Sequence, residues 1–358
     1  MKIGVVGATG LVGQTFLQIL EQRSVGGAAA TGVSSADATG FDLALFASEN
    51  SVGKTMSFRG KSYPVHALSK GCFNGLELVF FSSGDPISQE WAPQAAQAGA
   101  WAVDNSAAFR MDDRYPLIVP EVNGDLLSRQ KTPTIIANPN CSTIQLVVAL
   151  NPLLKNLGLE SVKVASYQSV SGAGQAGVDE LDSQIAAYAG ALSRSESNPQ
   201  HSLKAKAFPH PILSSCIPQI GSLQEGGYYS EEIKVIRESK KILRSPRLRV
   251  SAMTVRVPVR ASHAEAVWVT LNKEVSREEV VATLAAAPGL VVQDDPAKSI
   301  YPLQGRAAGE DPVFVGRIHR DVEDPFTWLF WVVSDNVRKG AALNGVQIAE
   351  LIFGSPLF

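Results

Sequence analysis

The residue that most directly suggests chemistry is Cys141, which stands where an apolar strand is expected to end and a helix to begin. The strand is expected over residues 135–137 and the helix over 142–154. A thiol at a helix N-terminus is shifted toward the thiolate, because the helix dipole stabilises the charge. The first N–H groups of the helix, with the amides of Asn138 and Asn140, could bind a developing oxyanion. Most free cysteines are structural, but this position favours a nucleophile.

A second motif is the glycine-rich turn Gly7-Ala8-Thr9-Gly10-Leu11-Val12-Gly13, which follows a strand expected over residues 3–6. A helix is expected to start in it and run over residues 12–22. Glycines let the backbone approach a pyrophosphate, and the helix N-terminus offers free N–H groups. A tight turn without a ligand is the alternative, and the strand–turn–helix context favours dinucleotide binding. The cofactor-binding residues expected in this turn are Gly7, Thr9, Gly10, Leu11 and Val12.

The end of the second strand of such a fold selects between NAD and NADP. An acidic residue there holds the ribose hydroxyls, whereas an arginine accepts the extra phosphate. Here the residues after the strand include Asn50, Ser51 and Lys54. The two side chains Asn50 and Ser51 could hydrogen-bond either ribose, and Lys54 could supply charge. This stretch could also be a plain surface turn, so it leaves the cofactor preference open.

Length, composition and charge limit the kinds of protein that this chain can be. The chain has 358 residues, 45% of them hydrophobic and 18% charged, with a formal charge of −2. This length suits two domains, and the charge gives no reason to expect nucleic acid. The three cysteines form no metal-ligand or disulfide pattern, and Cys72 and Cys216 have no setting like that of Cys141. Without a long apolar stretch or a secretory core, we expect no membrane contact, no metal and a cytoplasmic location.

Hydrophobic patterning predicts an α/β fold with two parts. In the first part, apolar runs alternate with helical segments, as in a parallel sheet. Strands are expected there over residues 3–6, 41–47, 76–81, 100–103 and 135–137, and a further helix over 87–97. Residues 24–40, rich in Gly, Ala and Ser, are expected to be a surface insertion.

The second part is richer in alternating β-segments, as expected for a mixed or antiparallel sheet with one covered face. Strands are expected over residues 162–169, 251–259, 264–271, 313–319 and 327–333, a long connection over 187–211, and a last helix over 336–352. We therefore predict a Rossmann-type nucleotide-binding domain plus an α+β catalytic and dimerisation domain. The first comprises residues 1–140 completed by 335–358, and the second comprises 141–334.

Ordered motifs over nearly the whole chain resemble the bacterial aspartate-semialdehyde dehydrogenases. The motifs, besides the glycine turn, are Asp104–Met111, Val119–Asn123, Asn138–Gln145, Tyr167–Gly174, Glu231–Lys234, Arg256–Arg260, Ser262–Glu265 and Asp335–Ala342. This resemblance implies interconversion of L-aspartyl 4-phosphate and L-aspartate 4-semialdehyde, on the route to diaminopimelate, lysine, threonine and methionine.

The resemblance also implies roles for single residues. Cys141 would attack the acyl phosphate to form a thioester, and His263 would be the general acid/base. Arg110, Lys234 and Asn140 would bind phosphate or substrate, Arg256 the substrate α-carboxylate. Glu231 would meet the substrate ammonium and Gln168 would orient the substrate. On the cofactor, Ser171, Gly172 and Asn336 would contact the nicotinamide side.

Two departures from the family pattern bear on these expectations. Family members commonly carry arginine at the position of Asn50, where it meets the 2′-phosphate. The resemblance implies NADP as the cofactor, and the lack of this arginine leaves NAD or the use of both open. The partners expected are a small-molecule substrate, phosphate and a second copy in a homodimer. The segment 24–40 is also longer than usual.

The sequence leaves two alternative functions open. One is a related reductase acting on N-acetylglutamyl phosphate or glyceraldehyde 3-phosphate, and the other is an inactive nucleotide-binding paralogue.

Overall fold

The computed structural model describes residues 1–31, 42–195 and 197–354. The chain divides into two compact units, one formed by residues 1–140 and 341–358 and the other by residues 141–340. Cys141 is thus the first residue of the second unit. Within the described ranges, no helix combines the length and the apolar character needed to cross a membrane.

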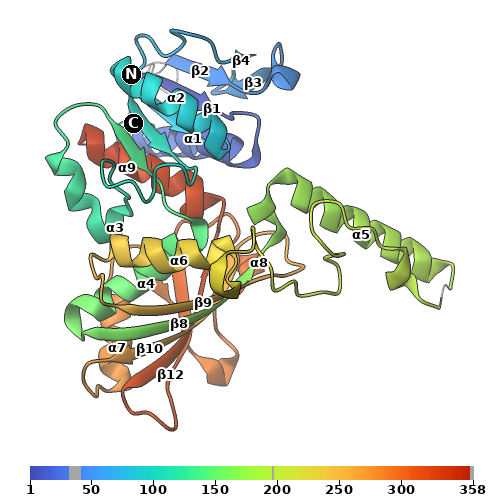
Figure 1. The fold of residues 1–358 in the computed structure, drawn as a ribbon, viewed down its shortest axis with the longest axis vertical. Coiled ribbons are helices and arrows are strands. Elements are labelled where there is room, and N and C mark those ends of the chain that lie inside the picture. Colours follow the sequence, from blue (N-terminus) through green and yellow to red (C-terminus); the bar gives the residue numbers. More distant parts are fainter. Residues whose placement is uncertain (32–41, 196, 355–358) are drawn as a thin grey trace. The chain divides into compact units, whose positions relative to one another are not determined.

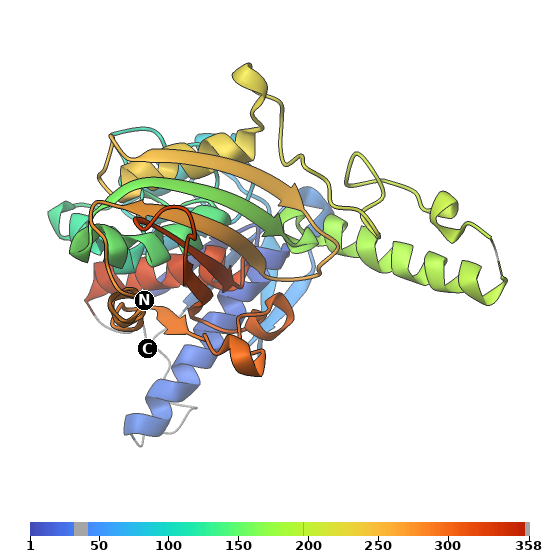
Figure 2. The same ribbon diagram turned by 90° about the horizontal axis from the view of Figure 1, so that it is seen from below.

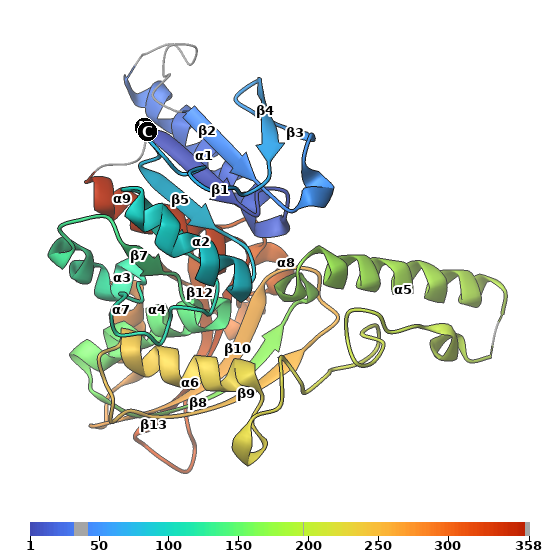
Figure 3. The same ribbon diagram turned by 45° about the horizontal axis from the view of Figure 1, so that its top comes forward.

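The first unit is built on a seven-stranded sheet in the order β3-β4-β2-β1-β5-β6-β7 (Figure 3). All its strand pairs are parallel except the β3–β4 hairpin. The strands are β1 (Lys2–Val6), β2 (Asp42–Phe46), β3 (Thr55–Phe58), β4 (Lys61–His66), β5 (Leu78–Phe81), β6 (Trp101–Asp104) and β7 (Ile135–Ala137). The five predicted parallel strands are present within two residues of the predicted bounds, and the hairpin was not predicted.

Helices cover both faces of this sheet because each strand is apolar on both sides. Phe80 of β5 stacks on Phe16 of α1 with ring centroids 4.4 Å apart, and α9 shares this core. Phe81 points the opposite way, toward Phe73, which contacts Trp91 of α2. The helices are α1 (Leu11–Thr31), η1 (Glu49–Ser51), α2 (Asp85–Gln97), α3 (Pro120–Asn123), η2 (Gly124–Arg129) and α9 (Leu343–Phe353).

The turn between β1 and α1 depends on two glycines. Gly7 has a φ of 81°, which a glycine adopts without strain. A Cβ on Gly13 would lie 2.3 Å from the carbonyl oxygen of Gly7 and 2.8 Å from the Cα of Ala8. Both obstacles are backbone, so the first turn of α1 can lie this close to the end of β1 only where residue 13 has no side chain.

The second unit is built on a six-stranded mixed sheet in the order β11-β12-β13-β10-β8-β9. Its strands are β8 (Leu159–Gln168), β9 (Arg249–Arg256), β10 (His263–Leu271), β11 (Leu290–Val292), β12 (Val313–Arg320) and β13 (Thr327–Ser334). The pairs β8–β9 and β11–β12 are parallel, and the others are antiparallel. The predicted α/β fold with a second mixed sheet is confirmed.

Helices α4 and α6 lie on one side of this sheet, and α5 projects away from it (Figures 1 and 2). The helices of the unit are α4 (Cys141–Asn156), η3 (Val170–Ala173), α5 (Gln175–Ser193), η4 (Pro199–Ser202), η5 (Glu225–Gly227), α6 (Ser230–Ile242), α7 (Arg277–Ala285), η6 (Pro296–Lys298), α8 (Gln304–Ala307) and η7 (Arg338–Ala342). On the opposite side of the sheet, α8 packs on β13 and buries Ala264 and Val333 together with Ala307, whereas Met253 of β9 is 60% exposed.

Several predicted boundaries were wrong. Helix α1 runs to Thr31 and so includes the start of the predicted insertion 24–40, whose residues 32–40 lie outside the described range. The predicted connection 187–211 begins inside α5, because its alanines and leucine favour helix. The predicted helix 336–352 starts as helix α9 only at Leu343, after the π-helical turn η7. Asp335 accepts from the N–H groups of Val337 and Arg338, which holds the preceding turn.

We expect Gly13→Ala to destabilise the first unit by about 3 kcal/mol, because its Cβ would collide with backbone that cannot move aside. Urea unfolding of the two variants Gly13→Ala and Gly305→Ala would measure the effect. A Cβ on Gly305 meets nothing within 4 Å, so that variant is the matched control. Equal unfolding midpoints for Gly13→Ala and the parent would contradict the close approach.

Candidate active site

Four polar residues meet at one edge of the sheet of the second unit. Strands β8 and β9 run in parallel and end side by side at Gln168 and Arg256, which are register partners. Strand β10 is antiparallel to β8, so it begins at the same edge, where His263 lies opposite Ser334 at the end of β13. Alternation along each strand then places all four side chains on the buried face.

Cys141 is fixed at this edge by contacts on both sides of its helix start. Gln168 donates from Nε2 to the hydroxyl of Ser142 at 2.6 Å, which ties α4 to the end of β8. On the other side, a Cβ on Gly340 would lie 2.8 Å from the Cβ of Cys141. Cys141 itself is half-buried and not in a disulfide. Its thiol thus stands at the first turn of α4, where the helix dipole favours a negative charge.

His263 is fully buried, and its hydrogen bonds define its tautomer. The backbone N–H of Ser169 donates to Nδ1 at 3.1 Å. Nδ1 must therefore be an acceptor, and the neutral ring carries its proton on Nε2. Among the described residues, Nε2 has no hydrogen-bond partner. The ring can thus present an N–H to a bound molecule.

Burial lowers the pKa of His263 well below its usual value, and the positive charge of Arg256 lowers it further. The imidazole is therefore neutral at pH 7. This environment suits a ring that donates a hydrogen bond to developing negative charge rather than one that enters as imidazolium.

Asn336 organises the loop beside this histidine. Its Oδ1 accepts from the hydroxyls of Ser169 and Ser171, at 3.1 and 3.0 Å, and from the N–H of Ser262 at 3.0 Å. Two of these donors lie in the residues after β8, and the third directly precedes β10. One carbonyl oxygen therefore links the β8–η3 loop to the start of β10.

Arg256 is buried yet lies among several partners. It donates from Nη1 to the carbonyl of Ser169 at 2.7 Å, and its guanidinium lies 5.8 Å from the ring centroid of Phe208. Burial lowers the pKa of Arg256, while the negative charges of Glu231 and Cys141 raise it. Arginine still keeps its proton in proteins, so a fixed cation stands near the thiol.

The space beside Arg256 and His263 depends on a glycine. A Cβ on Gly172 would lie 2.7 Å from Arg256 Nη1 and 3.0 Å from His263 Cε1. The η3 turn therefore passes directly over both functional groups. Only a residue without a side chain fits there unless those groups move.

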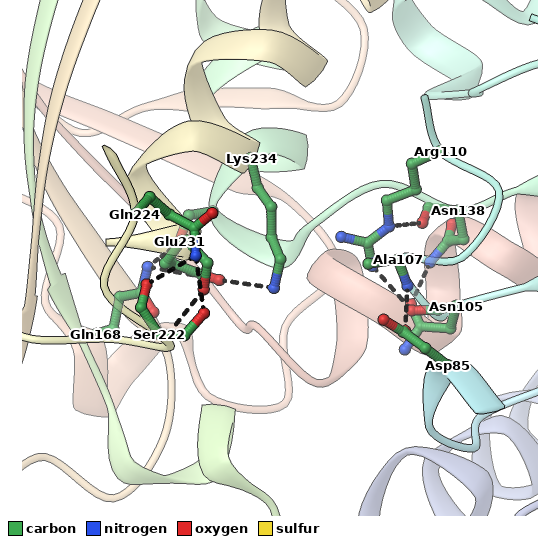
Figure 4. A network of polar contacts seen from close by, with 12 residues as sticks. Asp85, Asn105, Ala107, Arg110, Asn138, Gln168, Ser222, Gln224, Glu231 and Lys234 are labelled. Carbon is green, nitrogen blue, oxygen red and sulfur yellow. Dashed lines mark hydrogen bonds and ion pairs between the residues drawn. The ribbon is translucent and has the colours of Figure 1, made fainter. Parts of the chain in front are cut away.

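Helix α6 adds a pair of opposite charges (Figure 4). Lys234 Nζ lies 3.4 Å from Glu231 Oε2, one helical turn apart, and Gln168 Nε2 lies 3.4 Å from Glu231 Oε1. Glu231 is buried. Helix α6 thus presents a carboxylate and an ammonium to the end of β8.

Arg110 belongs to the first unit and is held by main-chain carbonyls. Its Nε donates to Asn138 at 2.9 Å and its Nη2 to Asn105 at 2.8 Å (Figure 4). The side chain of Asn138 donates to Asn105 Oδ1 at 2.7 Å and accepts from Asn344 of α9 at 2.6 Å. A chain of amides from the last helix therefore sets the direction of this guanidinium.

Two carboxylates hold the loop that carries Arg110. Asp104, at the end of β6, accepts from the hydroxyl of Ser106 at 2.6 Å. Burial raises the pKa of Asp104, and the hydrogen bonds of Ser106 lower it in part. Asp85, the first residue of α2, accepts from the N–H of Ala107 at 2.8 Å.

The nucleotide turn lies in the same unit and has the geometry expected from sequence. Its Thr9 hydroxyl donates to Ser51 at 3.3 Å, so the turn contacts the end of β2. Asn50 and Lys54 are exposed between β2 and β3. Gly7 and Gly13 let the start of α1 pack closely against the backbone at the end of β1. The N-terminus of α1 is thereby held at the turn, where its N–H groups fit the pyrophosphate of a dinucleotide.

The predicted residues thus fall into two groups. The second unit brings together Cys141, Gln168, Ser171, Gly172, Glu231, Lys234, Arg256, His263 and Asn336. The first unit holds Arg110, Asn140 and the predicted cofactor residues of the turn. Sequence reasoning missed the supporting residues Ser142, Ser169, Gly340 and Asn344. All four lie close in sequence to a quoted motif, but nothing in the sequence distinguished them from their neighbours.

Comparison with known proteins covers the same two units. Residues 2–130 match the family model described as semialdehyde dehydrogenase, NAD binding domain, and residues 150–339 match semialdehyde dehydrogenase, dimerisation domain. The aspartate-semialdehyde dehydrogenase of Aquifex aeolicus is 44% identical over 353 residues, which are 98% of this chain and 97% of that protein.

Solved structures agree. Aspartate semialdehyde dehydrogenase II of Vibrio cholerae, crystallised in complex with ASA, is 40% identical with a TM-score of 0.88, covering 99% of this chain and 98% of that one. The Candida albicans aspartate semialdehyde dehydrogenase with NADP is 25% identical with a TM-score of 0.71, covering 98% of both chains.

Because His263 is buried and neutral, we predict that the free energy of unfolding depends on pH. Below pH 6.5 the unfolded chain takes up a proton on this residue, whereas the folded chain resists it, so stability falls as the pH falls. The folded parent should lose about 1.4 kcal/mol per pH unit from this group alone. His263→Asn removes that loss.

Thermal unfolding between pH 5 and 7.5 would measure this difference, with the exposed His66→Asn as the matched control. We expect the melting temperature of His263→Asn to change less with pH than those of the parent and the control. Three parallel curves would contradict a buried neutral imidazole.

Proposed function

The chain belongs to the aspartate-semialdehyde dehydrogenase family, and from this premise we propose that Cys141 carries a thioester during the NADPH-dependent reduction of L-aspartyl 4-phosphate to L-aspartate 4-semialdehyde. The observation that carries this proposal is the shared edge of the second sheet. There the helix that begins at Cys141 meets a neutral His263 with an unpartnered Nε2–H and the buried cation of Arg256.

In the proposed reaction, the Cys141 thiolate attacks the acyl carbon, a C–S bond forms, and the bond to the phosphate oxygen breaks. NADPH, when bound, supplies the hydride that reduces the thioester. The resulting oxyanion re-forms a carbonyl as the C–S bond breaks and the thiolate returns. His263 Nε2–H stabilises that oxygen by donating a hydrogen bond. This is the donor half of the acid/base role expected from sequence.

We propose that each charged end of the substrate binds a side chain of opposite charge. Arg256 takes the α-carboxylate, Glu231 the ammonium, and Gln168 holds the substrate beside the thiol. Arg110 and Lys234, with Asn140, take the phosphate. The carbonyl contacts of Arg110 and the ion pair of Lys234 with Glu231 support these roles, because each cation is already oriented.

The domain roles follow from the same premise. Residues 1–140 with 335–358 bind the cofactor, and 141–334 carry catalysis. The turn residues Gly7, Thr9, Gly10, Leu11 and Val12 hold the pyrophosphate. Asn50 and Ser51 contact the adenosine ribose, and Ser171, Gly172 and Asn336 contact the nicotinamide side. NADP is the proposed cofactor, supported by the NADP of the Candida albicans neighbour, and Asn50 permits use of NAD.

We propose that the protein is a cytoplasmic homodimer formed through the face of the second sheet opposite α4. That face holds a groove of about 370 Å³ lined by apolar side chains, among them Trp268, Leu329 and Trp331. Met253 and Tyr167 are exposed on it as well. Such a patch fits a protein interface. The three free thiols fit a reducing compartment.

The relatives do not favour the alternatives. They are aspartate-semialdehyde dehydrogenases over nearly the full length of this chain. A reductase for N-acetylglutamyl phosphate or glyceraldehyde 3-phosphate, or an inactive paralogue, would leave the combination of Glu231, Lys234 and Arg256 without a use.

Cys141→Ser should lower turnover by about a thousandfold or more, because a neutral hydroxyl replaces the nucleophile. The assay is phosphate-dependent oxidation of aspartate semialdehyde, with NADP and with NAD compared at equal concentration. Binding of the cofactor by fluorescence should be unchanged. Cys72→Ser and Cys216→Ser are the controls and should keep parental rates. Parental turnover in Cys141→Ser would overturn the nucleophile, and no turnover of the parent with either cofactor would overturn the proposed function.

Arg256→Leu should raise the KM for aspartate semialdehyde about 10- to 100-fold, since a charge-assisted contact to the α-carboxylate is lost. The exposed Arg249→Leu on the same strand is the matched control. The KM for the nucleotide should stay constant in both variants. An unchanged semialdehyde KM in Arg256→Leu would refute the carboxylate contact.

A further inference from the structure

A second polar layer lies directly below the one that contains Cys141 and His263. Glu265 follows His263 by two residues on β10, so both side chains point to the same buried face. Gln145 follows Cys141 by four residues on α4, which places both on one face of the helix. Both Glu265 and Gln145 are fully buried.

The distance from Cys141 to Gln145 along α4 is close to the distance from His263 to Glu265 along β10. One helical turn advances about 5.4 Å, and two strand residues advance about 6.7 Å. Helix α4 packs on β10. The pair of Gln145 and Glu265 therefore repeats the pair of Cys141 and His263 one layer deeper, between the same helix and the same strand.

Among the described residues, no hydrogen-bond partner explains the carboxyl of Glu265. Its neighbours in the sheet register are Ser166 on β8 and Val332 on β13, neither of which is charged. Besides His263 on β10, the charged or titratable groups on the surrounding elements are Cys141 and Lys155 on α4, Glu160, Lys163 and Tyr167 on β8, Arg249 and Arg256 on β9, and Glu231, Glu232, Lys234, Arg237, Glu238, Lys240 and Lys241 on α6. Burial raises the pKa of Glu265 to about 8, and hydrogen bonding of Gln145 lowers it in part. The carboxyl is therefore protonated at pH 7.

A protonated carboxyl and an amide are complementary, because each has one donor side and one acceptor side. Within the part of the chain that the structure describes, the side-chain polar atoms of Glu265 and Gln145 have no hydrogen-bond partner, and the amide of Gln145 is the one group that lowers the pKa of this carboxyl. Two buried groups with complementary donors and acceptors are therefore left facing one another, and a small side-chain rotation would pair them. A charged carboxylate would lack the donor and would be buried without a counter-charge, which is strongly unfavourable. The neutral form is the one that fits.

We propose that Glu265 is a positioning residue, which as a neutral acid hydrogen-bonds to Gln145 and so fixes the start of α4, with Cys141, against the start of β10, with His263. The proposal deepens the function proposed above and rests on it for the meaning of the turnover data. It does not need that function for the thiol-reactivity data described below.

Glu265→Gln keeps one donor side and one acceptor side for the proposed contact with Gln145, and it cannot ionise. We expect its kcat to stay within about threefold of the parent at pH 6.5. Above the pKa of about 8 the parent should lose activity relative to the variant, by about tenfold at pH 9. A ratio of the two kcat values that stays constant from pH 6 to 9.5 would overturn the proposal.

Glu265→Leu removes the contact. We expect kcat to fall about tenfold or more at every pH while the KM for the nucleotide is unchanged, and Gln145→Leu should do the same. The double variant should lose no more than either single variant, because both remove one interaction. Additive losses would contradict a shared contact. Thr254→Val removes another buried hydroxyl on the same face and is the matched control.

Alkylation of Cys141 by iodoacetamide, followed on its peptide by mass spectrometry, tests the position of the thiol without any substrate. We expect Glu265→Leu to react about tenfold more slowly than the parent, and Glu265→Gln within threefold of it. A folded Glu265→Leu, shown by circular dichroism, that reacts at the parental rate would overturn the proposal. If the parent lacks turnover, the proposed function fails, and these alkylation rates still decide the role of Glu265.

Discussion

The hydrogen bond from the Ser169 N–H to His263 Nδ1 is the contact on which the rest of the site depends. A main-chain N–H can only donate, so it fixes which ring nitrogen carries the proton. The bond forms in a fully buried position, where water does not compete. The result is a neutral imidazole that offers one N–H at the edge where helix α4 begins. Strand order produces this arrangement, because β8 ends where β10 starts.

Burial also decides which side chains of the second unit stay charged. Removal of Arg256 from water disfavours its charge, and a carbonyl, an aromatic ring and the nearby negative groups offset that cost. His263 and Glu265 have no counter-charge of this kind, and both are neutral instead. The face of the sheet under α4 thus combines one retained cation with two groups held uncharged. A nucleophilic sulfur in this setting would lie near the positive charge of Arg256 and the N–H donor of His263. Neither His263 as imidazolium nor Glu265 as carboxylate would add a further charge there.

Glycines set the distances in both units. Gly13 permits the close approach of α1 to β1, Gly172 leaves room above Arg256 and His263, and Gly340 lies against Cys141. In each case the added Cβ would be less than 3 Å from an atom of the site or its support. A methyl group at Gly172 or Gly340 would displace Arg256, His263 or Cys141, and one at Gly13 would displace the backbone of the glycine turn. The close packing around the site therefore requires residues without a side chain at these three positions.

The sequence by itself determined the parallel first sheet, the strand–turn–helix at the glycine motif and the family, and it predicted Cys141 as the nucleophile. These depend on local pattern or on ordered motifs, which are read along the chain. It did not determine the β3–β4 hairpin, the length of α1, the tautomer of His263 or the support from Gly340 and Asn344. Those depend on contacts between residues far apart in sequence. Only the folded chain brings Glu265 below His263 and next to Gln145, because burial and strand register are properties of the assembled sheet.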